Sequence, residues 1–312
     1  MKFCVENHAL LWAVAVAASA MNFKSSQLKE KLMFTACLLT KFMALPINLC
    51  QRLKVLNQVG LRMIKPIEKY LLDKIKAEGT VHITLIDPEK ATPPQASRIA
   101  SIAMSNGTSA IMVGGSTLVS TGHLDDVVKA IKHTVSIPTI LFPNNITGIS
   151  RYADAIWFMS LLNSVDPYFI IGAHILGAPL VKKYQLEAIP MGYLIVGEGG
   201  TAGVMGKAIP VPYNKPEVAA AHALAAQYLG MRFIYLEAGS GASVPVPPEM
   251  IRAVKYFVDV PLIVGGGIRT KEQALATASA GADIIVTGNV FEKSETEQKV
   301  SEIIEAIRKS RA

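Results

Sequence analysis

The chain has 312 residues, 51% of them apolar and 18% charged, which suits one large folded domain with an appendage. All three cysteines lie in the first fifty residues, which excludes a disulfide framework or cysteine metal site in the remaining body and is typical of a reducing cytoplasm. The net charge of +7 does not indicate nucleic-acid binding, because the basic residues are scattered; an acidic small substrate or an anionic membrane surface accounts for the sign.

The first 62 residues form an apolar segment that we predict to be an extension outside the main fold. Residues 9–23 are an uncharged run of fifteen, shorter than the ~20 residues that a membrane span needs. Three interpretations remain open: Met63 is the natural start, residues 1–62 are a membrane-associating arm, or they hold a cleaved signal peptide. We therefore predict two parts, 1–62 and 63–312, in a cytoplasmic protein, with peripheral membrane contact through 1–62 as the open alternative.

From residue 64 onward, short apolar runs alternate with helix-like stretches. Eight strands are predicted, at 81–87, 110–115, 139–144, 155–160, 188–196, 233–238, 262–267 and 284–289. Helices are predicted at 93–106, 123–134, 167–185, 215–229, 247–257, 270–280 and 295–309, with only a short segment between the third and fourth strands. Continuous apolar strands indicate burial on both faces. We therefore predict an α/β fold, a (β/α)8 TIM-type barrel with an extra N-terminal apolar extension.

A barrel of this kind carries its active site at the C-terminal ends of its strands. The seventh and eighth predicted strands end at residues 265–267 (Gly-Gly-Gly) and 287–289 (Thr-Gly-Asn), where bare backbone lets amide groups approach a ligand closely. For any one glycine a role in a tight turn is the alternative, but two neighbouring strands that end alike favour an anion. We predict that this side of the barrel binds a phosphate monoester.

The sixth predicted strand adds the sequence YLEAGSGA. Tyr235 and Glu237 share one face of this strand, because side chains alternate between faces, and the glycines after them add further amides. A carboxylate beside a phosphate is costly unless it has a function, so Glu237 is a candidate general base or anchor for a substrate hydroxyl. The alternative is structural, with Tyr235 capping the barrel and Glu237 neutralising Arg269.

On the opposite side of the barrel, the first two strands end in side chains that suit a hard cation. Asp87 follows the first strand, and Ser116 and Thr117 follow the second. Mg²⁺ needs only one or two protein oxygens, because phosphates and water supply the others. The histidines show no metal-ligand spacing, so zinc is not expected. Two alternatives remain open: Asp87 as an N-cap or turn residue before Pro88, and Lys90 as either a solvated helix residue or a phosphate contact.

Seven strings occur in the order HITLIDPEK, VGGST, DAIWFMSLLNS, PYFIIGAHILGAP, YLEAGSGA, LIVGGGIR and VTGN. Together they closely resemble the geranylgeranylglyceryl phosphate synthase family, the prenyltransferases of archaeal ether-lipid synthesis, over roughly residues 64–312. The third and fourth strings resemble group II of that family. The resemblance implies a transferase that joins sn-glycerol 1-phosphate to geranylgeranyl diphosphate, with Mg²⁺ as cofactor, to make the first ether bond of archaeal membrane lipids.

Carried over by position, the resemblance also implies the site residues. The metal ligands would be Asp87 and Ser116, and the catalytic residues Asp87 and Glu237. The glycerol 1-phosphate site would be formed by Tyr235, Leu236, Glu237, Ala238, Gly239, Ser240, Gly241, Gly266, Gly267, Gly288 and Asn289. We also expect a homo-oligomer that binds no nucleic acid.

Three other functions remain open. A related prenyltransferase with a different prenyl chain length would keep every motif, because chain length depends on pocket depth. Another phosphosugar-binding barrel enzyme would keep the phosphate site, but it needs an acid and a base at the first and fifth strand ends, and the fifth strand offers only Glu198. A non-catalytic membrane-bound lipid-phosphate binding protein would explain the apolar segment but not the phosphate site.

Overall fold

The computed structural model describes residues 65–117, 120–288 and 296–309. By internal contacts the chain divides into two units, Met1–Met63 and Ile64–Ala312. The described residues all belong to the second unit, and the predicted extension 1–62 lies outside them. Within these described ranges, no helix is both long and apolar enough to cross a membrane.

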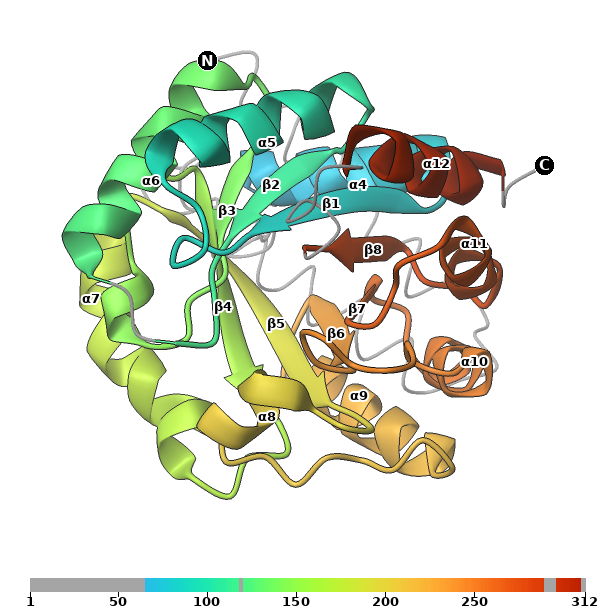
Figure 1. Ribbon diagram of the computed structural model, residues 1–312. Helices are drawn as coiled ribbons and strands as arrows, with labels where there is room; N and C mark the ends of the chain where they lie inside the picture. Colours follow the sequence, from blue (N-terminus) through green and yellow to red (C-terminus); the bar gives the residue numbers. More distant parts are fainter. Residues whose placement is uncertain (1–64, 118–119, 289–295, 310–312) are drawn as a thin grey trace, which may run out of the picture. The chain divides into compact units, whose positions relative to one another are not determined.

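Among the described residues, eight parallel strands close into a barrel in chain order, and the last strand pairs back with the first (Figure 1). The strands are β1 (Val81–Ile86), β2 (Ala110–Val113), β3 (Thr139–Leu141), β4 (Ala155–Leu161), β5 (Glu187–Ile195), β6 (Phe233–Glu237), β7 (Leu262–Gly265) and β8 (Ile284–Thr287). The predicted (β/α)8 barrel is confirmed, because continuous apolar strands can bury one set of side chains inside the barrel and the other under the helices.

Helices surround the barrel (Figure 1). They are α4 (Pro66–Glu78), α5 (Pro93–Ser105), α6 (Thr121–Thr134), α7 (Ala173–Lys183), α8 (Gly200–Met205), α9 (Pro216–Tyr228), α10 (Pro248–Phe257), α11 (Lys271–Ser279) and α12 (Thr296–Lys309). The predicted helix 167–185 is two elements, because a π-helical turn, η2 (Tyr168–Gly172), precedes α7. The helix α8 is an addition to the predicted elements, since six residues are too few to show a helical period.

A single 3-10 turn, η1 (Ile146–Gly148), lies between β3 and β4, where the other consecutive strands are joined through an α-helix. The Asn145 side chain begins the turn by accepting from the Thr147 amide at 2.7 Å. This agrees with the short segment predicted there. Because η1 stands between α6 and α7, one turn fills the place of a whole helix.

The helix α4 closes the N-terminal end of the barrel. Its Leu71 is fully buried among the inward side chains of the strands. Glu187, at the start of β5, accepts from the Ile67 and Glu68 amides at 2.9 and 2.8 Å, so that a carboxylate satisfies the N-terminus of the helix. With this end filled, the open space of the barrel lies at the C-terminal ends of the strands.

His82 of β1 is buried in the barrel wall below that open end. Its ring nitrogens contact the Thr108 and Thr287 hydroxyls at 3.0 and 2.8 Å. Burial lowers the pKa of His82 from 6.5 to about 3. The folded protein therefore keeps this ring neutral at pH values where the unfolded chain binds a proton, so acid favours unfolding.

We expect His82 alone to lower the free energy of unfolding by about 2 kcal/mol between pH 7 and pH 5. The effect of His82 is confined to the pH range from about 6.5 down to about 3, between the pKa values of the unfolded and folded protein. The His82→Gln protein should be less stable at pH 7 but should lack this component of the pH dependence. Urea unfolding of both proteins at the two pH values measures it. Equal pH dependence in parent and variant would contradict the assignment.

Candidate active site

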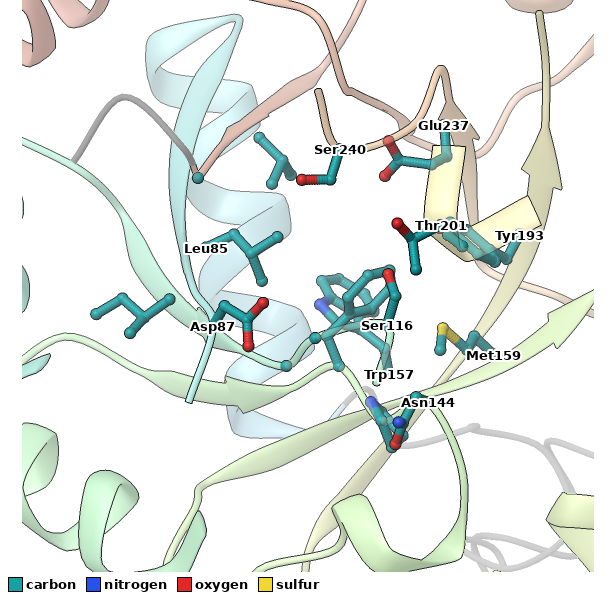
Figure 2. A pocket seen from close by; sticks show the side chains of 18 of the residues that line it. Leu85, Asp87, Ser116, Asn144, Trp157, Met159, Tyr193, Thr201, Glu237 and Ser240 are labelled. Carbon is teal, nitrogen blue, oxygen red and sulfur yellow. The ribbon is translucent and has the colours of Figure 1, made fainter. Parts of the chain in front are cut away.

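A cavity of about 1290 Å³ opens at the C-terminal ends of the strands. Residues from the ends of all eight strands line it, which matches the place where barrels of this type carry their active sites. Its volume exceeds that of a typical pocket for one small ligand. Figure 2 shows Asp87 and Glu237 on opposite sides of this cavity.

Most of the predicted site residues line the cavity. They are Asp87, Ser116, Tyr235, Glu237, Ser240, Gly241, Gly266, Gly267 and Gly288, together with the weaker candidates Lys90 and Thr117. Asn289 lies outside the described residues. The structure thus brings together two groups, one at the ends of β1 and β2 and the other at the ends of β6, β7 and β8.

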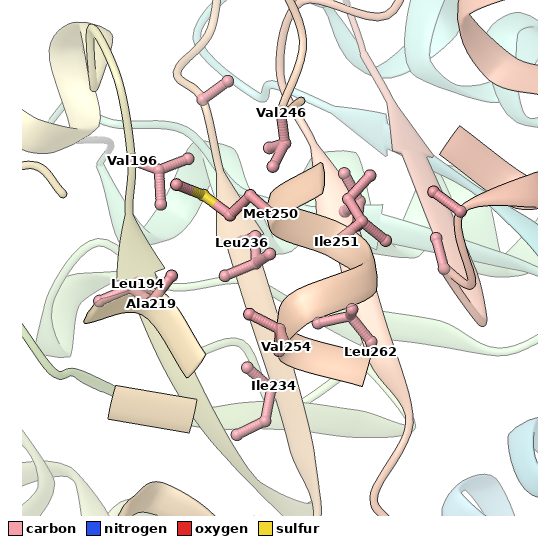
Figure 3. Packing of buried hydrophobic residues seen from close by; sticks show 14 of the residues in the cluster. Leu194, Val196, Ala219, Ile234, Leu236, Val246, Met250, Ile251, Val254 and Leu262 are labelled. Carbon is pink, nitrogen blue, oxygen red and sulfur yellow. The ribbon is translucent and has the colours of Figure 1, made fainter. Parts of the chain in front are cut away.

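Three predicted residues, Leu236, Ala238 and Gly239, do not line the cavity. Leu236 and Ala238 belong to the buried layer between the barrel and the outer helices. Figure 3 shows Leu236 facing Met250 and Val254 of α10. The reason is the alternation of side chains along β6, which sends Tyr235 and Glu237 inward and Leu236 outward. The Gly239 amide donates to Glu237 Oε1 at 2.7 Å, so Gly239 acts on the Glu237 carboxylate and not on the cavity wall.

Glu237 is held by neutral partners. The Tyr193 and Tyr235 hydroxyls and the Gly239 amide donate to its carboxylate, which is 6% exposed. Burial raises the pKa of Glu237, and these hydrogen bonds oppose part of the rise because they favour the charged form. Arg269 instead donates to the Ala242 carbonyl at 2.7 Å. Glu237 and Arg269 therefore have different hydrogen-bond partners, which argues against the alternative that Glu237 neutralises Arg269.

Beneath Glu237 lies an aromatic group of which the sequence analysis identified only Tyr235 and missed Phe142 and Tyr193. The rings of Phe142, Tyr193 and Tyr235 pack with centroids 5.3 to 5.6 Å apart. Tyr193 could have been predicted from the sequence, because it points inward from β5 two residues before the strand ends. Phe142 follows β3 directly, so its place beside two strands distant in sequence depends on barrel closure.

The triple glycine is needed by the backbone itself. Gly266 and Gly267 have φ of +83° and +74°, which side-chain-bearing residues rarely adopt. A Cβ on Gly266 would lie 2.5 Å from Glu237 Oε1, and one on Gly267 would lie 2.7 Å from the Val244 carbonyl. Close packing thus explains both glycines without a ligand. Gly288 is different, since its φ is not positive and, among the described residues, a Cβ would meet nothing nearer than Leu85 at 3.4 Å.

Gly288→Ala is consequently the cleaner test of a phosphate-binding backbone. We expect the variant to melt close to the parent, and its Michaelis constant for the phosphate-bearing substrate to rise about tenfold, because the new methyl group would occupy cavity space. Gly267→Ala should instead lower thermal stability through strain and collision, by about 1–3 kcal/mol. Melting curves and steady-state kinetics of both variants measure this. A well-folded Gly288→Ala protein with unchanged kinetics would remove Gly288 from the site.

Asp87 and Ser116 fit a hard cation by the chemistry of their oxygens. Asp87 Oδ1 accepts from the Glu89 amide at 3.0 Å, so the carboxylate makes the turn contact considered above and also lines the cavity. A Cβ on Gly115 would collide with this carboxylate, so the glycine leaves room for it beside Ser116. Within the described part of the chain, no three His, Cys, Asp or Glu side chains are placed to share an ion. A bound Mg²⁺ would therefore take its remaining ligands from substrate and water.

Apolar residues line the part of the cavity beside η1, where a helix is missing, and we call this part the apolar branch. Its walls come from β4, α7 and the segment after η1, and include Ile149, Ile156, Phe158, Gly177 and Val181. A Cβ on Gly177 would lie 3.2 Å from Ile149, so glycine keeps this branch open at α7. The cavity therefore combines a polar mouth with an apolar extension.

Comparisons with known proteins agree with this geometry. Residues 72–307 match the PcrB family. The chain is 54% identical over 243 residues to geranylgeranylglyceryl phosphate synthase of Thermofilum pendens, covering 78% of this chain and 95% of the relative. It is 57% identical over 242 residues to the Methanothermobacter marburgensis protein of the same name, covering 77% and 98%.

A solved structure is similar as well. The Thermoplasma acidophilum (S)-3-O-geranylgeranylglyceryl phosphate synthase, in complex with its substrate sn-glycerol-1-phosphate, superposes with a TM-score of 0.76 at 42% identity. The match covers 79% of this chain and 100% of that chain.

Proposed function

The chain belongs to the PcrB family, and we propose from this premise that it is a prenyltransferase joining sn-glycerol 1-phosphate to geranylgeranyl diphosphate. The products are geranylgeranylglyceryl phosphate and diphosphate, so the reaction makes the first ether bond of an archaeal membrane lipid. The observation that carries the proposal is the identity of 54% and 57% to synthases of that product, over 95% and 98% of their length.

The acceptor is proposed to bind on the side formed by β6, β7 and β8. Its phosphate would lie against Ser240, Gly241 and Gly288, and its 3-hydroxyl would face Glu237. Glu237 accepts the hydroxyl proton, for which the raised pKa suits it. The hydroxyl oxygen bonds to C1 of the prenyl donor while the bond from C1 to the diphosphate oxygen breaks, and the electron pair leaves with diphosphate.

The donor headgroup is proposed to bind on the side formed by β1 and β2. Asp87 and Ser116 would hold Mg²⁺ there, and the ion, when bound, neutralises charge on the diphosphate leaving group. Lys90, whose Nζ lies 4.0 Å from Asp87 Oδ2, adds positive charge at the same edge. The apolar branch beside η1 is proposed to bind the isoprenoid tail, because moving the hydrocarbon surface of the tail out of water there lowers its free energy.

The proposal is tested by incubating the purified full-length protein with Mg²⁺, labelled sn-glycerol 1-phosphate and prenyl diphosphates of increasing length. Extractable labelled product with geranylgeranyl diphosphate as the best donor is expected. A different preferred donor would select the related prenyltransferase with another chain length. Binding of glycerol phosphate without turnover of any donor would contradict a prenyltransferase and favour another phosphate-binding barrel or a lipid-phosphate carrier. Omission of Mg²⁺ and use of sn-glycerol 3-phosphate are the matched controls.

We further propose a homo-oligomer. The outward face of η2 and α7 carries Ile171, Ile175 and Leu176 at 54, 67 and 55% exposure, although the outer face of a surface helix is normally polar. We expect light scattering to give a mass above that of one chain, and Ile175→Glu to shift it toward the monomer. A parent protein that is monomeric would contradict this. Cytoplasmic location and membrane contact through 1–62 stay predictions.

A further inference from the structure

The loop between β6 and α10, residues 238–247, supplies the part of the cavity wall formed by Ser240 and Gly241. It has little regular structure, yet two hydrogen bonds hold its first half in place. The Gly239 amide donates to Glu237 Oε1 at 2.7 Å. The Ala238 carbonyl accepts from the Gly199 amide at 3.1 Å, which attaches the loop to the turn after β5.

Two charged residues hold the second half of the loop. They follow β5 and β7, the strands on either side of β6. Arg269, which follows β7, donates from Nη2 to the Ala242 carbonyl at 2.7 Å. Glu198, which follows β5, accepts from the Ser243 hydroxyl. The Ser243 hydrogen bonds, and after them the positive charge of Arg269, lower the pKa of Glu198. Arg269, Glu198 and Ser243 thus form one network around the loop.

Arg269 also lines the cavity itself. Of the cavity-lining cations in the described ranges, Lys90 and Arg98 follow β1, and Arg269 alone follows β7. Its position is therefore on the side where the acceptor phosphate is proposed to bind. The exposed Arg252 of α10 offers a comparison, because its guanidinium pairs with Glu249 of the same helix at 3.0 Å.

We infer that Arg269 is a positioning residue for the acceptor phosphate: by holding the Ala242 carbonyl it keeps Ser240 and Gly241 in their places at the cavity wall. The contact between Glu198 and Ser243 is a second tether of the same loop. The identity of the phosphate ligand rests on the proposed function. The tether itself does not, because it is formed by residues of this chain alone.

The first measurement needs no substrate. Hydrogen exchange of amides 239–244 is followed by mass spectrometry in the parent, Arg269→Ala and Arg252→Ala proteins. We expect about tenfold faster exchange in this segment for Arg269→Ala, since a hydrogen bond from a charged donor is removed, and parent-like exchange for Arg252→Ala. Unchanged exchange in Arg269→Ala would overturn the tether whatever reaction the protein catalyses.

The second measurement concerns the acceptor. For Arg269→Ala we expect the Michaelis constant for sn-glycerol 1-phosphate to rise about tenfold, with that for the prenyl diphosphate within about twofold of the parent value. Arg269→Lys should recover part of the loss, since an ammonium group can also donate to the Ala242 carbonyl. Ser243→Ala combined with Arg269→Ala should show a non-additive effect, because both tethers act on one loop.

Equal increases in both Michaelis constants, or purely additive effects of the two substitutions, would overturn the positioning role. If the parent protein shows no turnover while the exchange result holds, the proposed function fails and the tether survives. Thermal melting of every variant separates these outcomes from loss of folded protein.

Discussion

Replacing Glu237 with Gln is expected to lower kcat by roughly 10²–10⁴-fold, the usual contribution of a general base. The amide side chain has almost the same shape, and its oxygen can still accept from the Gly239 amide now at 2.7 Å. It cannot accept the proton of the substrate hydroxyl. Binding of sn-glycerol 1-phosphate, measured by calorimetry, should change much less than kcat.

The matched control is Glu249→Gln, because Glu249 is an exposed carboxylate of α10 whose side chain is 70% accessible. This variant should keep parent kinetics. A Glu237→Gln protein that melts normally and turns over within about tenfold of the parent would show that another group takes the proton.

The pH dependence of kcat/KM is a second test of the Glu237 carboxylate. Burial raises the pKa of Glu237, and the hydroxyls of Tyr235 and Tyr193 hold it back. Only the deprotonated form can act as base, so kcat/KM should rise with pH through a value above 4.5. Tyr235→Phe removes one of the opposing hydrogen bonds and should move this acid limb to higher pH. A limb that moves to lower pH would contradict the hydrogen-bond assignment.

The barrel and the ends of its strands could be predicted because both depend on local pattern. Continuous apolar strands must be buried on both faces. A barrel of eight parallel strands surrounded by helices provides this burial. Asp87, Ser116, Tyr235 and Glu237 were then identified by following each strand to its end. The place of η1 was indicated by the short spacing between the third and fourth strands.

What could not be predicted depends on contacts between distant segments. The need for glycine at position 267 comes from the Val244 carbonyl, and sequence alone does not distinguish such crowding from a phosphate site. Leu236 was placed in the site by carrying over a continuous stretch, although strand alternation sends it outward. The contact between Arg269 and Ala242 likewise appears only when the ends of β6 and β7 meet.

Asp87→Asn should lower kcat by about 10²–10³-fold and raise the Mg²⁺ concentration needed for half-maximal rate, if this carboxylate holds the ion beside the leaving group. Asn is preferred to Ala because its oxygen can keep the contact with the Glu89 amide, now 3.0 Å, so the turn before α5 should persist. Affinity for sn-glycerol 1-phosphate should stay within about twofold, since Asp87 and Glu237 lie on opposite sides of the cavity (Figure 2).

The matched control is Asp126→Asn, because Asp126 is an exposed carboxylate of α6 that pairs with Lys129 at 3.4 Å and does not line the cavity. Calorimetry with each substrate and a Mg²⁺ titration of the rate separate the outcomes. Loss of both ligands from a folded Asp87→Asn protein would mean that the two sides of the cavity are not independent. An unchanged Mg²⁺ requirement would mean that the ion is held elsewhere, and the role of Asp87 would then reduce to its turn.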